Sequence, residues 1–209
     1  MRALRRSPTL VTLALVLAVF ACQELAGLLG WRGLFALSNP LLSRPWTVVT
    51  SVYAHASVSH LVANAVALAL GGLLVERLTT SARFHAFFVS VGALAGVTQV
   101  ALVGVVGPLV PGMPAQVAVL GASGAILGLY GYLLGANRVT ELLVGGIELE
   151  PRFQLALGVL LAGLVTVLTA NPGAALIAHF TGLLLGFLAG RAHLLAPGEN
   201  TQGRPPAVE

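Results

Sequence analysis

Residues 121–135 read GASGAILGLYGYLLG, an apolar stretch punctuated by glycine. The glycines recur at spacings of 3, 4, 3 and 4, which places them on one continuous face of a helix. A second stretch, residues 176–190, reads LIAHFTGLLLGFLAG, and its glycines recur every fourth residue, beginning one turn after His179. Small residues at this spacing let two membrane helices approach closely. We therefore predict that these helices are neighbours, with His179 at their seam and Ser123 at its edge.

The composition of the whole chain excludes a water-soluble globule. Of the 209 residues, 57% are hydrophobic and only 9% are charged, whereas an ordinary soluble domain carries about 25% charged residues. All 11 basic residues are Arg and all 7 acidic residues are Glu, so no mechanism can use Lys or Asp. The net charge of +4 does not indicate nucleic-acid binding, because the arginines are scattered between apolar segments. We expect an all-α membrane protein.

Six stretches of the chain are long and apolar enough to cross a membrane, since a transmembrane helix needs about 20 mostly apolar residues. They are residues 9–29, 54–75, 84–105, 118–136, 153–170 and 173–194. Between the last two, Asn-Pro-Gly at residues 171–173 predicts a tight turn. We expect one six-helix membrane-embedded domain over residues 1–195, followed by a disordered tail over residues 196–209.

Six spans put both chain ends on one side of the membrane, and the arginines indicate which side, because positive charge is retained in the cytoplasm. One set of connections contains only Arg32 and Arg44. The other set, with the two termini, contains Arg2, Arg5, Arg6, Arg77, Arg83, Arg138, Arg152, Arg191 and Arg204. We therefore predict cytoplasmic termini in a multi-pass protein of the plasma membrane. We also expect the first helix to be uncleaved, because its apolar run continues past Cys22.

The connection between the first two spans, residues 30–53, combines aromatic and apolar residues with two arginines. This composition is typical of the membrane–water interface. Pro40 and Pro45 prevent the loop from becoming a further span. We expect the loop to lie partly in the outer leaflet, and an ordinary aromatic belt is the alternative interpretation.

Polar side chains inside the predicted spans are the main functional signal, because such groups are costly in hydrocarbon. Those in the second, fourth and sixth spans are His60, Asn64, Ser123 and His179. They lie roughly 8 to 15 Å below the outer surface, so three helices bring four polar groups to one depth. Taken singly, each could make a structural hydrogen bond, within its helix or between helices. Gln99 in the third span is interpreted as such a packing contact.

Three motifs, taken in order, resemble those of a known family. GASG at residues 121–124 resembles the GxSG motif of rhomboid intramembrane serine proteases. AHFTGLLLG at residues 178–186 resembles the AHxxGxxxG helix of the same family. His55, His60 and Asn64, in the order His-x4-His-x3-Asn, match its second-helix pattern. The resemblance covers the six-helix core and leaves out only the tail.

The resemblance implies a six-helix rhomboid-like bundle and a role for each matching residue. Ser123 would be the nucleophile and His179 the general base. His60, Asn64 and the backbone N–H of Ser123 would form the oxyanion hole. The supporting residues would be His55, Gly121 and Gly124. Because Asp is absent and every Glu falls near a span end or outside the spans, we expect a serine–histidine dyad without a carboxylate.

Two positions depart from the family's pattern. Trp46 is followed by Thr47, where many relatives carry Trp-Arg in the first loop. Leu127 stands four positions after the serine, where many bacterial relatives place an aromatic residue that stacks on the base. The orientation of His179 therefore has to come from other contacts.

These features predict hydrolysis of single-pass or polytopic membrane proteins near the outer end of a transmembrane helix, with the site opening to the non-cytoplasmic side. A helical backbone is hydrogen-bonded internally, so we expect a preference for helices weakened by Gly, Pro or polar residues. By resemblance, a small residue precedes the cleaved bond. The first alternative is a catalytically silent scaffold or chaperone that binds membrane helices. The second is a transporter or metal protein using His55, His60 and His179. We expect no cofactor, no metal and no nucleic-acid partner.

Overall fold

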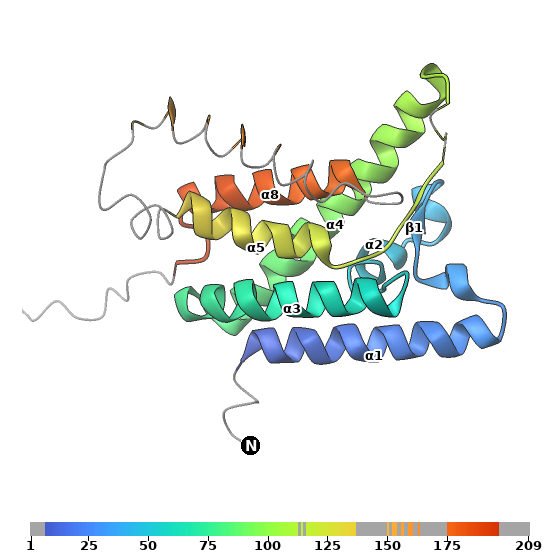
Figure 1. The fold of residues 1–209 in the computed structure, drawn as a ribbon, viewed down its shortest axis with the longest axis horizontal. Helices are drawn as coiled ribbons and strands as arrows, with labels where there is room; N and C mark the ends of the chain where they lie inside the picture. The colour runs from blue at the N-terminus through green and yellow to red at the C-terminus, as the bar shows by residue number, and fades with distance from the viewer. Residues whose placement is uncertain are drawn as a thin grey trace, which may run out of the picture.

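The computed structural model describes residues 7–112, 114, 116–136 and 175–196, together with positions 150, 152, 153, 156, 159, 160 and 163. In these parts the chain is mostly helical (Figure 1). The main helices are α1 (Pro8–Leu28), α3 (Val58–Val75), α4 (Ser81–Val106), α5 (Ser123–Gly135) and α8 (Leu176–Arg191). The shorter elements are α2 (Thr47–Thr50), the strands β1 (Leu37–Ser38) and β2 (Ala118–Val119), and 3-10 helices at Arg32–Leu34, Leu41–Ser43, Glu76–Leu78 and Gly107–Leu109.

Three of the described helical stretches are long and apolar enough to cross a membrane, namely Pro8–Leu28, Val58–Leu78 and Ser81–Leu109. They confirm the first three predicted helices to within a few residues. The apolar helices α5 and α8 are shorter, with 13 and 16 residues, and lie within the fourth and sixth predicted spans. Most of the fifth predicted span, the turn at residues 171–173 and residues 197–209 lie outside the described residues. The six-span count therefore stays a prediction.

The fourth helix begins later than its apolar pattern predicts. Residues 118–122 are expected to be helical, but α5 begins at Ser123. Ala118 and Val119 instead form β2, in which Val119 pairs antiparallel with Leu37 of β1. The backbone groups of residues 118 and 119 thus find partners in a distant loop, and the local apolar pattern carries no sign of this pairing.

The helices begin in two different ways. Helices α1, α3 and α4 each follow a capping hydroxyl, from Ser7, Ser57 and Thr80 respectively, as is usual where a helix starts near water. Helices α5 and α8 follow Ala122 and Ala175, which provide no side-chain cap. The first backbone N–H groups of α5 and α8 therefore donate no hydrogen bond to the side chain of an N-cap residue.

Helices α8, α5, α3 and α1 run side by side in that order, and α4 packs against both α5 and α8 (Figure 1). The contact between α5 and α8 is the predicted glycine seam. A Cβ atom added at Gly182 would overlap the carbonyl of Gly124, and one added at Gly186 would overlap the carbonyl of Gly128. The two backbones therefore touch directly, which confirms that these helices are neighbours.

The apolar core lies between α3, α4 and α5. Its largest fully buried side chains include Phe84 and Phe88 of α4, Leu68 of α3 and Leu129 of α5. The rings of Phe84 and Phe88 are stacked with their centroids 6.3 Å apart. This core holds α3 against α5, on the face of α5 that lies away from α8 and the glycine seam.

The first loop is held together by its own side chains. The Arg44 guanidinium donates to the carbonyl of Gly33 and, over 3.2 Å, to the hydroxyl of Ser38 in β1. Trp46 Nε1 donates to the carbonyl of Leu34 over 3.0 Å. An arginine two positions before the tryptophan, instead of directly after it, therefore ties the loop to the strand that pairs with β2.

Candidate active site

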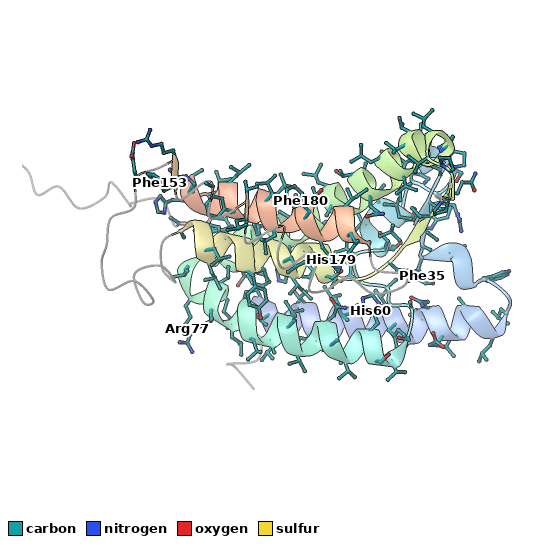
Figure 2. All side chains as sticks on the ribbon, turned by 45° about the horizontal axis from the view of Figure 1, so that its top comes forward. Phe35, His60, Arg77, Phe153, His179 and Phe180 are labelled. Carbon is teal, nitrogen blue, oxygen red and sulfur yellow. The ribbon has the colours of Figure 1, made fainter. Side chains whose placement is uncertain are left out.

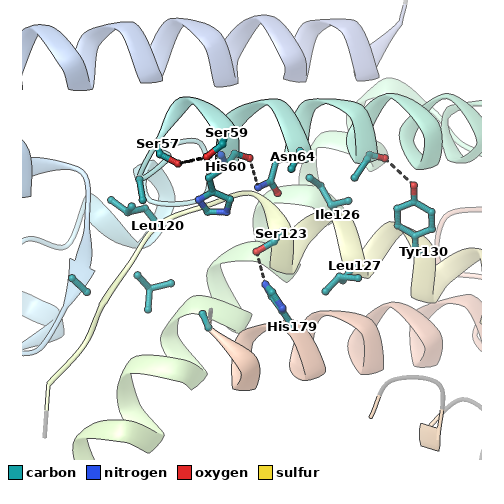
Figure 3. A pocket seen from close by; sticks show the side chains of 16 residues that line it. Ser57, Ser59, His60, Asn64, Leu120, Ser123, Ile126, Leu127, Tyr130 and His179 are labelled. Atoms are coloured by element: carbon teal, nitrogen blue, oxygen red, sulfur yellow. Dashed lines mark hydrogen bonds between the residues drawn. The ribbon is translucent and has the colours of Figure 1, made fainter. Parts of the chain in front are cut away.

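The polar residues predicted at one depth come from three helices and lie at one level of the bundle. Figure 2 shows His179 of α8 facing His60 of α3, while Arg77 lies near the opposite end of α3. The close view in Figure 3 adds Ser123 between them and Asn64 beside His60 on α3. The structure thus brings together four polar side chains that the sequence scatters over more than half of the chain.

Ser123 is the first residue of α5, and the glycine before it shapes the turn. Gly121 has φ +131, a conformation that favours glycine, and its N–H donates to the carbonyl of Ser51 over 2.9 Å. A Cβ atom at Gly121 would lie only 2.7 Å from Cε1 of His60. The prediction that Gly121 continues the glycine stripe is therefore wrong, because this residue precedes α5 and faces His60 on α3 instead of α8.

His179 lies in the first turn of α8 and reaches across the seam. Its Nε2 atom lies 2.9 Å from the Oγ atom of Ser123, and both side chains are half-buried. One turn later Gly182 packs on the backbone of Gly124, the residue after Ser123. The close approach of the two backbones therefore sets the distance between the serine and the histidine.

His60 and Asn64 lie one turn apart on α3 and face the same space. The amide of Asn64 donates one N–H to the carbonyl of His60 over 2.9 Å, and an amide nitrogen carries two hydrogens. Both residues line a cavity of about 730 Å³ that Ser123 and His179 also line (Figure 3). The side chains of α3 therefore provide hydrogen-bond donors to the cavity that holds the serine.

His55 lies in the turn before α3 and is fully buried. Its ring centroid is 5.1 Å from that of His60, in an edge-on arrangement. Nδ1 lies 3.1 Å from the carbonyl of Tyr53, so Nδ1 carries the hydrogen, while Nε2 has no hydrogen-bond partner in the described part of the chain. Burial lowers the pKa of His55 to about 4, and the neighbouring His60 acts in the same direction. His55 is therefore neutral and supports the His60 ring without reaching the cavity.

Two buried glutamines hold the segments that carry these histidines. Gln99 of α4 accepts a hydrogen bond from the backbone N–H of Ala178 over 3.1 Å. This bond confirms the interpretation of Gln99 as a packing contact, and it fixes the backbone of the residue directly before His179. Gln23 of α1 pairs with the backbone of His55. Sequence reasoning did not single out Gln23, although a glutamine within an apolar helix is itself a signal.

The cavity continues from the serine along α5. Leu127 lines it, as does Tyr130, whose hydroxyl donates to the carbonyl of Ala67 on α3 over 3.0 Å. At position 127, four residues after the serine, the cavity is therefore lined by an aliphatic side chain. The bond between Gln99 and Ala178 is one contact that fixes the backbone beside His179.

The arrangement suits nucleophilic chemistry better than metal binding. Within the described ranges, no three His, Cys or Glu side chains are grouped as metal ligands would be. A serine hydroxyl becomes nucleophilic when a neighbouring base accepts its proton, and Nε2 of His179 is within hydrogen-bond distance of it. The uncapped N-terminus of α5 adds backbone N–H groups and a partial positive charge beside Ser123. Such a site can stabilise negative charge that develops on a carbonyl oxygen.

Comparison with known proteins agrees with the motifs. Residues 42–195 match the family model described as Rhomboid domain. A Bacillus subtilis (strain 168) protein with the name "Putative rhomboid protease YdcA" is 29% identical over 143 residues. The alignment covers 68% of this chain and 64% of that protein, so the chain spans less than two thirds of the relative's length. α1 precedes the matched region, which takes in α3, α4, α5 and α8.

Proposed function

Because the chain belongs to the rhomboid family, we propose that it is an intramembrane serine endopeptidase in which Ser123 and His179 form a catalytic dyad. The observation that carries the proposal is the 2.9 Å contact between Ser123 Oγ and His179 Nε2, at a cavity inside a bundle of apolar helices. A scaffold that only binds membrane helices does not require a histidine within hydrogen-bond distance of a serine.

The proposed reaction follows ordinary acyl transfer. Ser123 Oγ attacks the scissile carbonyl while its proton moves to Nε2 of His179. The carbon–nitrogen bond then breaks, and His179 returns the proton to the leaving amine. Water hydrolyses the acyl-enzyme by the same steps in reverse order. We propose a dyad without a third carboxylate because the chain contains no Asp and its Glu residues fall near the ends of the predicted spans or outside them.

The oxyanion hole is proposed to consist of His60, Asn64 and the backbone N–H of Ser123. The first two approach the cavity from α3, and the third lies at the uncapped end of α5. A donor of this kind is worth roughly 3 to 4 kcal/mol when it meets the negative charge of the transition state. His55, Gly121 and Gly124 are proposed as supports: His55 behind His60, Gly121 in the turn before the serine, and Gly124 in the seam.

A direct test of the dyad needs no knowledge of the natural substrate. We expect a fluorophosphonate probe to label the purified protein in detergent, and Ser123→Ala and His179→Ala to abolish labelling. Circular dichroism and thermal unfolding would show that both variants are folded. A folded wild-type protein that neither reacts with the probe nor cleaves membrane helices would instead support the scaffold function.

The proposed substrates are membrane proteins cut near the outer end of a transmembrane helix. The peptide bond has to leave its helix before it can enter the cavity, since helical backbone groups are bonded to each other. A single-pass test protein with Gly-Pro in the outer third of its helix should be cleaved. The same protein with both residues replaced by Leu should resist cleavage, and equal cleavage of the two would contradict the proposal.

The proposed topology has six spans in a domain over residues 1–195, with both termini and the tail at residues 196–209 in the cytoplasm and the site open to the other face of the plasma membrane. Single cysteines in a Cys22→Ser background test this orientation. In intact cells, a membrane-impermeant thiol reagent should label Ser43→Cys, in the first loop, where the native side chain is polar and exposed. Ala207→Cys should react only after lysis, and the reverse pattern would invert the topology.

A further inference from the structure

Gln23 is a buried polar residue on α1, the helix that precedes the region matched to the family. Its Nε2 donates to the carbonyl of His55 over 2.7 Å, and its Oε1 accepts from the N–H of His55 over 3.1 Å. The side-chain amide and the backbone of one residue thus form a closed pair of hydrogen bonds. The pair satisfies both backbone groups of His55 in a place where an aliphatic side chain would leave them unpaired.

The contacts continue from His55 to the cavity. The His55 ring is held by the carbonyl of Tyr53 at 3.1 Å and lies edge-on to the His60 ring, with centroids 5.1 Å apart. On its other side, His60 occupies the space that the missing side chain of Gly121 leaves open. The His60 ring is therefore confined between His55 and the turn that leads to Ser123.

We propose that Gln23 is a positioning residue, which fixes the backbone of His55 and through the His55 ring holds His60 in the orientation that stabilises the oxyanion. This inference rests on the proposed function of His60. It assigns to α1 a part in the reaction, although α1 contributes no residue to the lining of the cavity.

A purely structural role for Gln23 predicts a different outcome. If the amide only joined α1 to the bundle, its loss would lower stability and would act independently of His60. If the amide acts through His60, its loss lowers the rate only while the imidazole of His60 is present. A double-mutant cycle separates these two cases, because residues that act as one unit have non-additive effects.

The variants are Gln23→Met, which keeps the length of the side chain without its hydrogen bonds, and Gln23→Glu, which can accept from the N–H of His55 but cannot donate to its carbonyl when ionised. The matched control is Glu24→Gln, at the next position on α1, where the side chain is exposed. Each is made alone and together with His60→Ala. The readouts are the rate of fluorophosphonate labelling, kcat and KM on the Gly-Pro test protein, and thermal unfolding in detergent.

We expect Gln23→Met to lower both the labelling rate and kcat on the order of tenfold, with KM within about twofold, because a small displacement of a catalytic group is costly. Gln23→Glu should fall between Gln23→Met and wild type, and it provides the test if Gln23→Met does not fold. In the His60→Ala background, Gln23→Met should change the labelling rate by less than about twofold. Glu24→Gln should behave as wild type throughout.

Three results would overturn the proposal: wild-type kinetics in folded Gln23→Met, an equal fold-loss with and without His60, or full activity in His60→Ala. Failure of the proposed function looks different. In that case the wild-type protein itself is unlabelled and inactive, as is Ser123→Ala, before any substitution is made on α1.

Discussion

The two walls of the cavity are built from different kinds of contact. On the side of α8, backbone meets backbone, since Gly182 and Gly186 leave no room for a Cβ atom against the carbonyls of Gly124 and Gly128. On the side of α3, side chains make the contacts, as in the bond of 3.0 Å from Tyr130 to the carbonyl of Ala67. A contact between two helix backbones can change only if a whole helix moves, whereas a side chain can change its rotamer. The comparison indicates that the serine–histidine distance is held rigidly and that the donors on α3 are held by contacts that can be removed one at a time.

The largest expected effect comes from breaking the seam at Gly186→Ala. The new methyl group would overlap the carbonyl of Gly128, so α8 has to move away from α5 and carry His179 with it. We expect a loss of about 1 to 3 kcal/mol in the free energy of unfolding and a fall on the order of 100-fold in the labelling rate of Ser123. Thermal unfolding and fluorophosphonate labelling in detergent measure both quantities.

The matched control is Gly96→Ala on α4. A Cβ atom there would meet only the end of the Leu37 side chain, at 3.2 Å, so that end has to shift by only a few tenths of an ångström and no backbone atom is displaced. We expect stability within about 0.5 kcal/mol of wild type and unchanged labelling. If the two alanine variants behave alike, the seam is not the rigid element of the site.

The second expected effect comes from the α3 wall, through Asn64→Ala. This change removes one proposed donor to the oxyanion and leaves the glycine seam untouched, so kcat should fall roughly 100-fold with little change in KM and without the loss of stability expected for Gly186→Ala. Cleavage of the Gly-Pro test protein at several concentrations separates the two constants. A rise in KM at constant kcat would show that Asn64 binds substrate without acting on the transition state.

The smallest expected effect comes from Tyr130→Phe, which removes the hydrogen bond to Ala67 and keeps the ring. Loss of one such bond should cost about 0.5 to 1.5 kcal/mol of stability and change the rate of cleavage by no more than about threefold. Thermal unfolding of Tyr130→Phe beside Gly186→Ala therefore compares the two walls directly. An equal loss of stability in the two variants would show that the two walls do not differ in this way.

Much of the fold and of the site could be read from local patterns. Apolar runs predict the positions of α1, α3 and α4, and the glycine spacing predicts that α5 and α8 touch. The depth of His60, Asn64, Ser123 and His179 indicates that they belong together, because few polar groups enter hydrocarbon without a reason. These features depend on composition and on the helical repeat, both of which are visible in a single stretch of chain.

The start of α5 and the role of Gly121 could not be predicted in the same way. The residues at 118–122 are apolar and look helical, but β1 offers Ala118 and Val119 backbone partners that a helix would otherwise supply. Gly121 fits the glycine repeat, yet its contact is the His60 ring on α3. In both cases a segment distant in sequence decides the outcome, and the local pattern contains no trace of it.

Composition and spacing alone thus determine that this chain forms apolar helices, that two of them meet through glycine, and which polar side chains lie together within those helices. Each of those properties follows from the residue itself or from its neighbours within a few turns. Tertiary packing decides which contacts fix the backbone beside these side chains. Gln23 binds the backbone of His55, and Gln99 binds the backbone of Ala178. Every residue except proline has the same backbone donor and acceptor. The sequence therefore does not show which backbone groups a glutamine side chain will bind, because that depends on which helices pack together.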